Sequence, residues 1–377
     1  MKLPLYLKVF AFTAIFAGLA LGAQAAETSA DPVIFSFAAL GDSRHDPKAA
    51  DLAPQDRIWL QNTKVLARIV QEVQAQKPNA LFFNGDMIMG YSTNAHKLNR
   101  EYAYWRGMMA GLLVTGTYVI PVPGNHELQI KADPDDESEK AVKLAQLEGE
   151  MAWRENMQDL IVDTNLWRRL TGLPVTAWNP TNTPSIGGPD RVRSDQQHLS
   201  FSFDSGRMHF AVINTDPIGN DSHAPVNWLA KDLARARERG CEHCFVFGHK
   251  MAYTYFFNQK SKPKGLDQFP DEAEAFWKVI EENHATYFCG HEHIYHAMQP
   301  KTSGPNRPWQ IIAGSAGSPF EAKEPNPAQP NDRMYAWVIT NVHQSGRVVM
   351  EAFGFDDQLG PTHRIETIEL EPAHSRS

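Results

Sequence analysis

The chain contains few cysteines, no excess of basic charge and a single long apolar run. Three cysteines in 377 residues is a low count. Cys241 and Cys244 form a C-x-x-C, and in an oxidising compartment this spacing predicts a small disulfide loop. A thioredoxin-like redox site would place the pair at the start of a helix, whereas residues 245–247 are Phe-Val-Phe and predict a strand. We expect Cys289 to be a buried, small apolar residue.

The apolar run lies at the N-terminus and has the organisation of a signal peptide. Lys2 and Lys8 give a basic start, residues 9–21 are apolar, and Ala23-Gln24-Ala25 matches a small-residue cleavage site. The run is shorter than the roughly 20 residues that span a bilayer, so an uncleaved anchor is the weaker alternative. No cysteine lies near the junction, which argues against a lipoprotein. We therefore expect cleavage after Ala25, a periplasmic or secreted protein, and no membrane span after cleavage.

The charge balance is acidic. The formal net charge is −8, and removal of the two N-terminal lysines brings it to about −10. Such a chain lacks the global basic footprint that is typical of nucleic-acid binding. A local positive pocket can still attract phosphate, so the charge argues only against broad polyanion binding.

Short apolar segments alternate with amphipathic segments in the first third of the chain. Residues 33–40, 80–83 and 118–122 predict strands, and residues 55–76 and 98–113 predict helices between them. This β-α-β-α-β order predicts parallel strands with crossover helices, so the fold class is α/β. The C-terminal half is expected to be mainly β.

We expect one domain over residues 32–355, followed by a C-terminal strand and tail over residues 356–377. The character of the sequence changes over residues 128–198. Residues 131–157 are highly charged and predict a helix, whereas residues 171–190 are rich in Pro, Gly, Thr and Asn and predict a loop. We interpret this segment either as an insertion near the mouth of a pocket or as a solvated surface excursion.

One arrangement recurs five times along the chain. A short apolar strand ends in a glycine, and a polar residue follows at once. Glycine lets the backbone turn sharply and approach a ligand closely. The carboxyl ends of strands in an open α/β sheet meet at one crevice, so these polar residues are expected to converge. They are Asp42, Asp86, Asn125 with His126, His249, and His291 with His293.

The residue types in this set suit a pair of divalent metal ions. Carboxylate and imidazole together favour zinc, manganese or iron over calcium. A carboxylate can bridge two ions, which makes Asp42 and Asp86 the bridging candidates. Two ions about 3.5–4 Å apart can hold a hydroxide between them and clamp the oxygens of a phosphate. The sequence therefore predicts a metal-dependent hydrolytic site.

These motifs resemble those of the calcineurin-like metallophosphoesterases, over about residues 33–320. Val246-Phe247-Gly248-His249 also fits the V-x-x-H of the purple acid phosphatase branch. The resemblance implies a four-layer αββα sandwich, two mixed sheets flanked by helices. It also implies that one metal is held by Asp42, Asp86 and His293. The other metal would be held by Asp86, Asn125, His249 and His291. His126 would protonate the leaving alcohol or stabilise the developing charge.

Two positions depart from the family pattern. Arg44 stands where a histidine is common, and a guanidinium has no lone pair to offer a metal. His45 could replace that histidine only if the turn differs. Arg44 is therefore interpreted as a phosphate clamp, or alternatively as a structural ion pair, and its presence predicts a weak first metal site. Met89 stands where the purple enzymes have a metal-binding tyrosine, and Tyr91 is mis-spaced, so zinc, manganese or magnesium remain candidates besides iron.

The predicted function is an exported phosphoesterase that acts on a small-molecule phosphate ester, with phosphomonoesters preferred over diesters. In this hypothesis Arg44, Asn125 and His126 contact the substrate. Two alternatives come from other classes. Gly41-Asp42-Ser43 resembles the opening of a GDSL-type serine esterase that would use Ser43, although this leaves the last three motifs without a role. The chain could also be a non-catalytic binding protein with a phosphoesterase fold.

Overall fold

The computed structural model describes residues 31–48, 53–131, 142–256, 261–300 and 307–370. Residues 1–25, the predicted signal peptide, lie outside these ranges. Within them, no helix is both long and apolar enough to cross a membrane.

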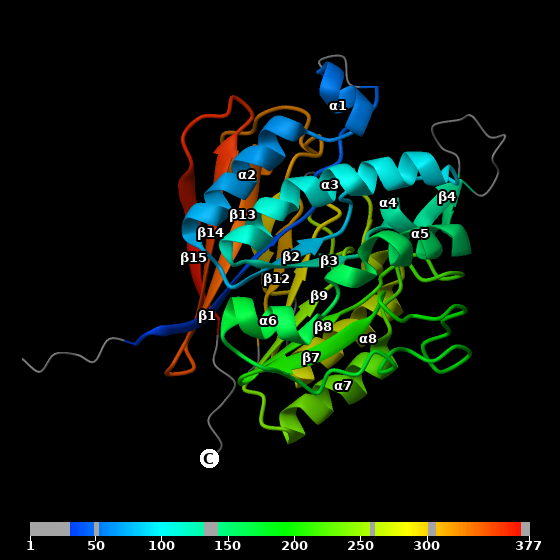
Figure 1. The fold of residues 1–377 in the computed structure, drawn as a ribbon, viewed down its shortest axis with the longest axis vertical. Helices are drawn as coiled ribbons and strands as arrows, with labels where there is room; N and C mark the ends of the chain where they lie inside the picture. Colours follow the sequence, from blue (N-terminus) through cyan, green and yellow to red (C-terminus); the bar gives the residue numbers. More distant parts are fainter. Residues whose placement is uncertain (1–30, 49–52, 132–141, 257–260, 301–306, 371–377) are drawn as a thin grey trace, which may run out of the picture.

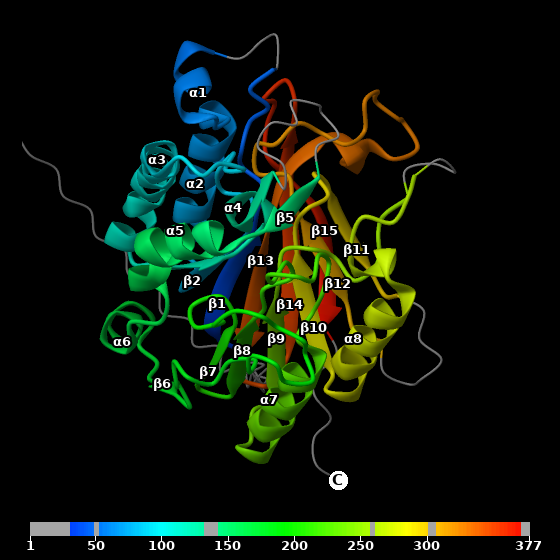
Figure 2. The same ribbon diagram turned by 90° about the vertical axis from the view of Figure 1, so that its right-hand side faces the viewer.

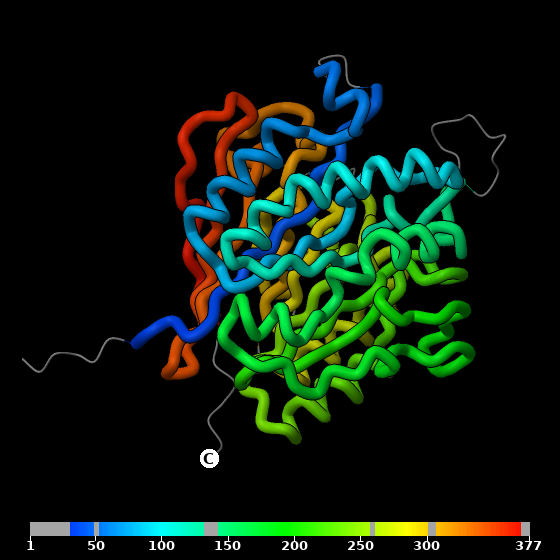
Figure 3. Tube along the Cα trace, in the orientation of Figure 1, coloured from blue at the N-terminus to red at the C-terminus, as the bar shows by residue number. Residues whose placement is uncertain are grey.

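Two large mixed sheets form the centre of the molecule. The first has six strands in the order β15-β14-β13-β1-β2-β3. Its strands β1 (Val33–Leu40), β2 (Ala80–Asn84) and β3 (Tyr118–Val122) are parallel, as the β-α-β-α-β order predicted. The C-terminal strands β13 (Met334–His343), β14 (Val348–Asp356) and β15 (His363–Leu370) extend it with antiparallel pairings. Figure 3 shows the orange and red C-terminal segments beside the blue N-terminal strand.

The second sheet has seven strands in the order β11-β12-β10-β9-β8-β7-β6. Its parallel centre consists of β8 (Met208–Val212), β9 (His243–Phe247), β10 (Ala285–Cys289) and β12 (Gln310–Ala313). The flanking strands β11 (Tyr295–Met298), β7 (Phe201–Ser205) and β6 (Val175–Thr176) run antiparallel to their neighbours.

Helices cover the outer faces of the two sheets. On one side lie α1 (Pro54–Trp59), α2 (Thr63–Gln76), α3 (Ala95–Thr115), α5 (Leu147–Met157) and α6 (Thr164–Thr171); on the other lie α7 (Val226–Glu238) and α8 (Pro270–Glu282) (Figures 1 and 2). The short helix α4 (Asn125–Leu128) and three short 3-10 helices, Gln158–Leu160, Leu266–Gln268 and Pro330–Arg333, complete the helical elements of the described residues. The predicted four-layer α/β architecture is therefore confirmed.

Aromatic side chains fill the space between the sheets. Phe37 of β1 contacts the rings of Phe245, Phe247 and Phe288 from the second sheet, at centroid distances of 5.0–5.7 Å. Phe82 of β2 stacks on Phe247 at 3.8 Å. Such contacts add about 0.5–1.5 kcal/mol each beyond area burial. They hold the two sheets face to face, so the strand ends of both sheets lie at the same edge.

The helix predicted over residues 55–76 is two helices, and this part of the prediction is wrong. The chain leaves the helical conformation at Leu60, whose φ is 54°, and Ile58 is 53% exposed rather than buried. The break is paired with the loop after β1: His45 N–H donates to the Leu60 carbonyl, and Arg44 bridges to Gln61. The contact with this loop outweighs the helical propensity of the segment.

The predicted helix over residues 131–157 is also corrected. Residues 132–141 lie outside the described ranges. Gln129–Lys131 (β4) and Lys143–Ala145 (β5) pair as an antiparallel hairpin, and the helix begins only at Leu147. Within residues 128–198, Trp153 and Trp167 are fully buried. These residues pack against the first sheet and its helices, so the segment contributes to the core.

The predicted disulfide is absent, because Cys241 and Cys244 are free thiols. Cys244 lies within β9 and packs into the core beneath α7 and α8, whereas Cys241 lies before the strand near Asp204. Burial raises the pKa of both thiols to about 12, which makes them poor nucleophiles. Cys289 is buried in the same apolar cluster, as predicted.

A buried ion cluster lies across strands β7 and β8. His209 Nδ1 is 2.6 Å from Asp204 Oδ1, and its Nε2 is 2.9 Å from Asp232 Oδ2. Both ring nitrogens face carboxylates, so both must donate and the ring is a cation. Burial lowers the pKa of His209, but the two carboxylates outweigh it and the net shift is upward. Arg239 neutralises the second charge of the cluster by a bidentate contact with Asp204.

We predict that His209→Ala destabilises the fold by about 3–5 kcal/mol at pH 5, because it leaves two buried carboxylates with one cation. Urea unfolding of both proteins measures this. A raised histidine pKa contributes stability below about pH 6.5, and that contribution is lost as the pH rises. Lowered aspartate pKa values contribute above about pH 4, and that contribution is lost on acidification. The difference in unfolding free energy between the wild type and His209→Ala should therefore be largest between about pH 4 and about pH 6.5. Equal urea midpoints of the two proteins at pH 5 would show that His209 does not stabilise the cluster.

Candidate metal centre

The five predicted motifs meet at the carboxyl ends of strands from both sheets. Asp42 follows β1, Asp86 follows β2, and Asn125 and His126 begin the short helix α4 (Asn125–Leu128) after β3. The remaining three histidines come from the second sheet: His249 follows β9, and His291 and His293 follow β10. All six predicted metal ligands and His126 lie in one buried cluster.

The backbone at this edge is held in conformations that are unfavourable for residues with side chains. Asp42, Asp86 and His291 have φ values of 62°, 52° and 70°. Such conformations cost of the order of 1–3 kcal/mol each and persist only where the surroundings impose them. Gly85 permits the close approach of two loops, since a Cβ there would lie 2.5 Å from Nδ1 of His249.

Four lone-pair atoms converge at the first of two candidate positions. His249 Nδ1 is 2.8 Å from the Asn84 carbonyl, which can only accept, so the ring proton of a neutral imidazole lies there. Its Nε2 then presents a lone pair. That atom lies 3.0 Å from Asn125 Oδ1, 3.1 Å from His291 Nδ1 and 3.2 Å from Asp86 Oδ1. Acceptors at these distances repel one another unless a proton or a metal ion lies among them.

The electrostatics of His249 lead to the same conclusion. Burial lowers the pKa of His249, but Asp86 and Asp42 outweigh it and raise the pKa to about 10. The cluster therefore binds a positive charge favourably. A divalent ion supplies that charge without protonating a ligand.

The second candidate position joins Asp42, Asp86 and His293, with ligand atoms within 4.8 Å of one another. His293 Nδ1 is 2.6 Å from the Pro319 carbonyl, so its Nε2 presents the lone pair. Asp42 is fully buried and its Oδ1 has no hydrogen-bond partner among the described residues. An orphaned buried carboxylate oxygen is costly, and a metal ion would satisfy it. The residues at both positions therefore fit divalent metals, with Asp86 common to the two.

Arg44 borders this second position. Its Nη2 lies 3.4 Å from His293 Nε2, and its Nε lies 3.8 Å from Asp86 Oδ2. The side chain is 16% exposed, so a ligand entering the site can reach it. His45 points elsewhere, with Nδ1 3.3 Å from the Asp46 carbonyl. The alternative in which His45 replaces the missing ligand therefore has no support in the geometry.

His126 lies against Asp86 at the same edge. Its Nδ1 is 2.7 Å from the Met89 carbonyl, and its Nε2 is 3.6 Å from Asp86 Oδ2. Burial and the nearby Arg44 lower the pKa of His126. The ring proton of the neutral form is therefore on Nδ1, and Nε2 faces the metal ligands.

Two further residues of this site were given no role from the sequence. Glu127 accepts hydrogen bonds from the backbone N–H groups of Asp86, Met87, Ile88 and Gly124, at 2.8–3.2 Å. Both of its oxygens are occupied as acceptors, and the Asp86 loop is thereby fixed. In the sequence, the feature that could have indicated this role is the glutamate that directly follows Asn125-His126.

Tyr91 is the second such residue. Its hydroxyl accepts a hydrogen bond from Asn125 Nδ2, and its ring packs on His126 at a centroid distance of 3.9 Å. By holding the amide nitrogen, Tyr91 turns Asn125 Oδ1 toward His249. The sequence placed Tyr91 near the site but only compared it with a metal ligand, because a hydrogen bond between two loops has no sequence pattern.

Asp216 and Lys250 form a buried ion pair beside the centre. Lys250 directly follows His249, and its ammonium lies 2.7 Å from Asp216 Oδ1 and 2.8 Å from Asp221 Oδ1. These contacts fix the loop that presents His249.

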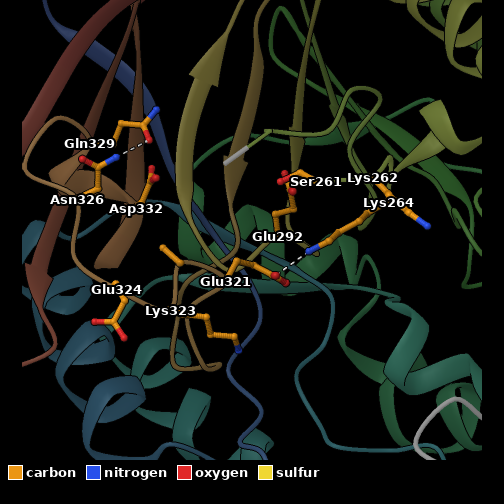
Figure 4. Close-up of a pocket in the computed structure, with 11 residues that line it drawn as sticks. Ser261, Lys262, Lys264, Glu292, Glu321, Lys323, Glu324, Asn326, Gln329 and Asp332 are labelled. Atoms are coloured by element: carbon orange, nitrogen blue, oxygen red, sulfur yellow. Dashed lines mark hydrogen bonds and ion pairs between the residues drawn. The ribbon is translucent and has the colours of Figure 1, made fainter. Parts of the chain in front are cut away.

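A pocket of about 560 Å³ lies beside the histidine loop (Figure 4). Glu292, between the two histidines of that loop, lines it together with Lys264 and Glu321, which form an ion pair of 2.6 Å. Burial raises the pKa of Glu292 to about 8.

Comparison with known proteins agrees with this geometry. The family model of the calcineurin-like phosphoesterases matches residues 36–295. The chain belongs to this family. The predicted resemblance is therefore confirmed. Ser43 is fully buried, with Oγ 3.5 Å from the Met87 carbonyl, so the serine esterase alternative is wrong.

Solved phosphoesterases share the fold of this family member. A purple acid phosphatase, PPD1, from yellow lupin (Lupinus luteus) seeds aligns with a TM-score of 0.51 and 12% identity, over 89% of this chain and 53% of its own. PhoD aligns with a TM-score of 0.51 and 13% identity, over 89% of this chain and 72% of its own. The chain thus spans about half the length of the lupin protein. No curated protein sequence matches it.

We predict that Tyr91→Phe weakens metal binding about tenfold, because loss of the partner that orients a ligand typically costs 10–100-fold in affinity. Competition with a chromogenic chelator measures this. Tyr104→Phe is the matched control, since the Tyr104 hydroxyl contacts Thr63 at 2.9 Å on the helical side of the molecule. Equal metal affinities of the wild type and Tyr91→Phe would show that Asn125 keeps its orientation without the hydrogen bond to Tyr91.

Proposed function

We propose that this family member is an exported, metal-dependent phosphoesterase that hydrolyses small phosphomonoesters in preference to diesters. The observation that carries the proposal is the convergence of oxygen and imidazole ligand atoms, with Asp42 Oδ1 lacking a hydrogen-bond partner in the described part of the chain. Bringing these groups together costs free energy, and bound divalent cations would relieve that cost.

Two metal ions would be held with Asp86 between them. One would be bound by Asp42, Asp86 and His293, and the other by Asp86, Asn125, His249 and His291. When bound, such a pair supplies Lewis-acid charge to the phosphate and activates water as the nucleophile. The mixture of carboxylate, amide and imidazole suits zinc, manganese, iron or magnesium.

The chain's own residues would bind and orient the ester. Arg44 reaches the edge of the site as a permanent cation and would donate hydrogen bonds to a phosphate oxygen. A phosphomonoester dianion has one more charged oxygen than a diester, so Arg44 supports the monoester preference. His126 would face the leaving alcohol with Nε2, the nitrogen that is not engaged by Met89, and would donate a proton from it only in the cationic form.

We predict that removal of metal by a chelator abolishes turnover of an aryl phosphate and that Mn²⁺ or Zn²⁺ restores it. Asn125→Ala should lower the restored turnover by about a hundredfold or more, because it deletes a ligand rather than a supporting contact. Asn165→Ala, on the exposed N-terminus of α6, is the matched control. Elemental analysis, followed by a panel of phosphomonoesters, nucleotides and diesters, identifies the metal and the substrate class. A protein that binds metal but turns over no member of the panel would instead be a binding protein.

Export rests on the N-terminal sequence and has its own test. We predict that the intact mass of the mature protein corresponds to a chain beginning at Ala26, and that deletion of residues 2–25 retains the protein in the cytoplasm. Cell fractionation and mass spectrometry measure both. Recovery of a chain that still contains residues 1–25 from the membrane fraction would favour the anchor alternative.

A further inference from the structure

A lysine from the β4–β5 hairpin reaches the wall of the metal centre. Lys143 Nζ lies 4.1 Å from the centroid of the Tyr91 ring, and the same ring packs on His126. Strand β5 lies beside α4, the helix that carries Asn125 and His126 (Figure 2). The ammonium group therefore lies on the side of the site where His126 would meet the leaving alcohol.

Lys143 has like-charged neighbours. Lys131 is its direct cross-strand partner in the hairpin, a pairing that destabilises a β-ladder when both residues carry the same charge. Burial, Arg44 and Lys131, in that order, lower the pKa of Lys143. No carboxylate within the described ranges forms an ion pair with Lys143. Arg44 and Lys143 thus place two cations beside the metal centre of a chain whose net charge is −8, and a bound anion would relieve their repulsion.

The hairpin is tied to the metal centre, so its lysines are held in place. Gln129 Nε2 of β4 donates to Asp216 Oδ1 at 3.1 Å and to Asp221 Oδ1 at 2.7 Å. The same two carboxylates hold Lys250, the residue after His249. The same two carboxylates therefore fix both the hairpin and the loop that carries the metal ligand His249.

Building on the proposed phosphoesterase function, we propose that Arg44 and Lys143 form an anion-binding subsite on the leaving-alcohol side of the metal centre. The substrates it selects are phosphomonoesters whose alcohol part carries a second anionic group. A carboxylate or a second phosphate offers the two cations the same charged oxygen acceptors. The phosphate to be cleaved lies at the metal ligands, and the second anion lies over Tyr91.

The test compares matched pairs of esters. 2-Phosphoglycerate and glycerol 2-phosphate differ by a carboxylate, and a hexose bisphosphate differs from the corresponding monophosphate by a phosphate. In the wild type, kcat/KM should be about tenfold higher for the more anionic member of at least one pair, and the pair that responds identifies the anion. Lys143→Met should bring this ratio close to one. Lys231→Met, on the exposed face of α7, should keep the wild-type ratio.

Binding without turnover provides a second measurement. Phosphonoacetate should bind the metal-loaded protein about tenfold more tightly than methylphosphonate in calorimetry, and Lys143→Met should remove the difference. Circular dichroism and metal content of each variant check that the fold and the centre are intact. Equal affinities for the two phosphonates in the wild type, together with equal kcat/KM within both ester pairs, would overturn the subsite. Failure to hydrolyse any ester would instead refute the proposed function, and the phosphonate comparison would still decide whether the subsite exists.

Discussion

The mutual repulsion of lone pairs at one edge of two packed sheets is the constraint on which the rest of this structure depends. Asn125 Oδ1, His291 Nδ1 and Asp86 Oδ1 lie 3.0–3.2 Å from His249 Nε2, so a proton or a metal ion is needed among them. Asp42 adds an orphaned oxygen. Such a cluster persists only if the surrounding fold holds it, and it defines what the site binds.

Several contacts offset the free energy that this repulsion costs. The aromatic layer between Phe37, Phe82 and Phe247 fixes the two sheets face to face, and so brings ligands from both sheets to one place. Closer to the site, Glu127 collects four backbone N–H groups and locks the Asp86 loop. The left-handed backbone at Asp86 is held by these bonds rather than by its own preference.

The open side of the centre is built from a different part of the chain. The β4–β5 hairpin and Arg44 contribute cations, whereas the ligands themselves are anionic or neutral. The positive charges therefore lie where a phosphate ester would enter, and the carboxylates lie where the metals would be bound. This division of charge explains how an acidic protein can present an anion-binding site.

The candidate site was largely predictable from the sequence, because each ligand lies in a short, recognisable stretch of the chain. A strand, a glycine and a polar residue are neighbours in the chain, and parallel strands bring their carboxyl ends together in any α/β sheet. Asp42, Asp86, Asn125, His249, His291 and His293 could be named for this reason, and so could the order of β1, β2 and β3. The family resemblance then supplied the four layers.

Tertiary contacts decided the rest. The break at Leu60 depends on the loop after β1, the strand at residues 143–145 depends on its partner β4, and the free thiols of Cys241 and Cys244 depend on the packing of β9. The roles of Tyr91, Lys143 and the His209 cluster arise between segments distant in sequence. Local sequence determines which groups stand at the strand ends, since that information lies within a few residues. Only the packed structure decides which groups from other segments orient and charge them, because those contacts have no fixed spacing along the chain.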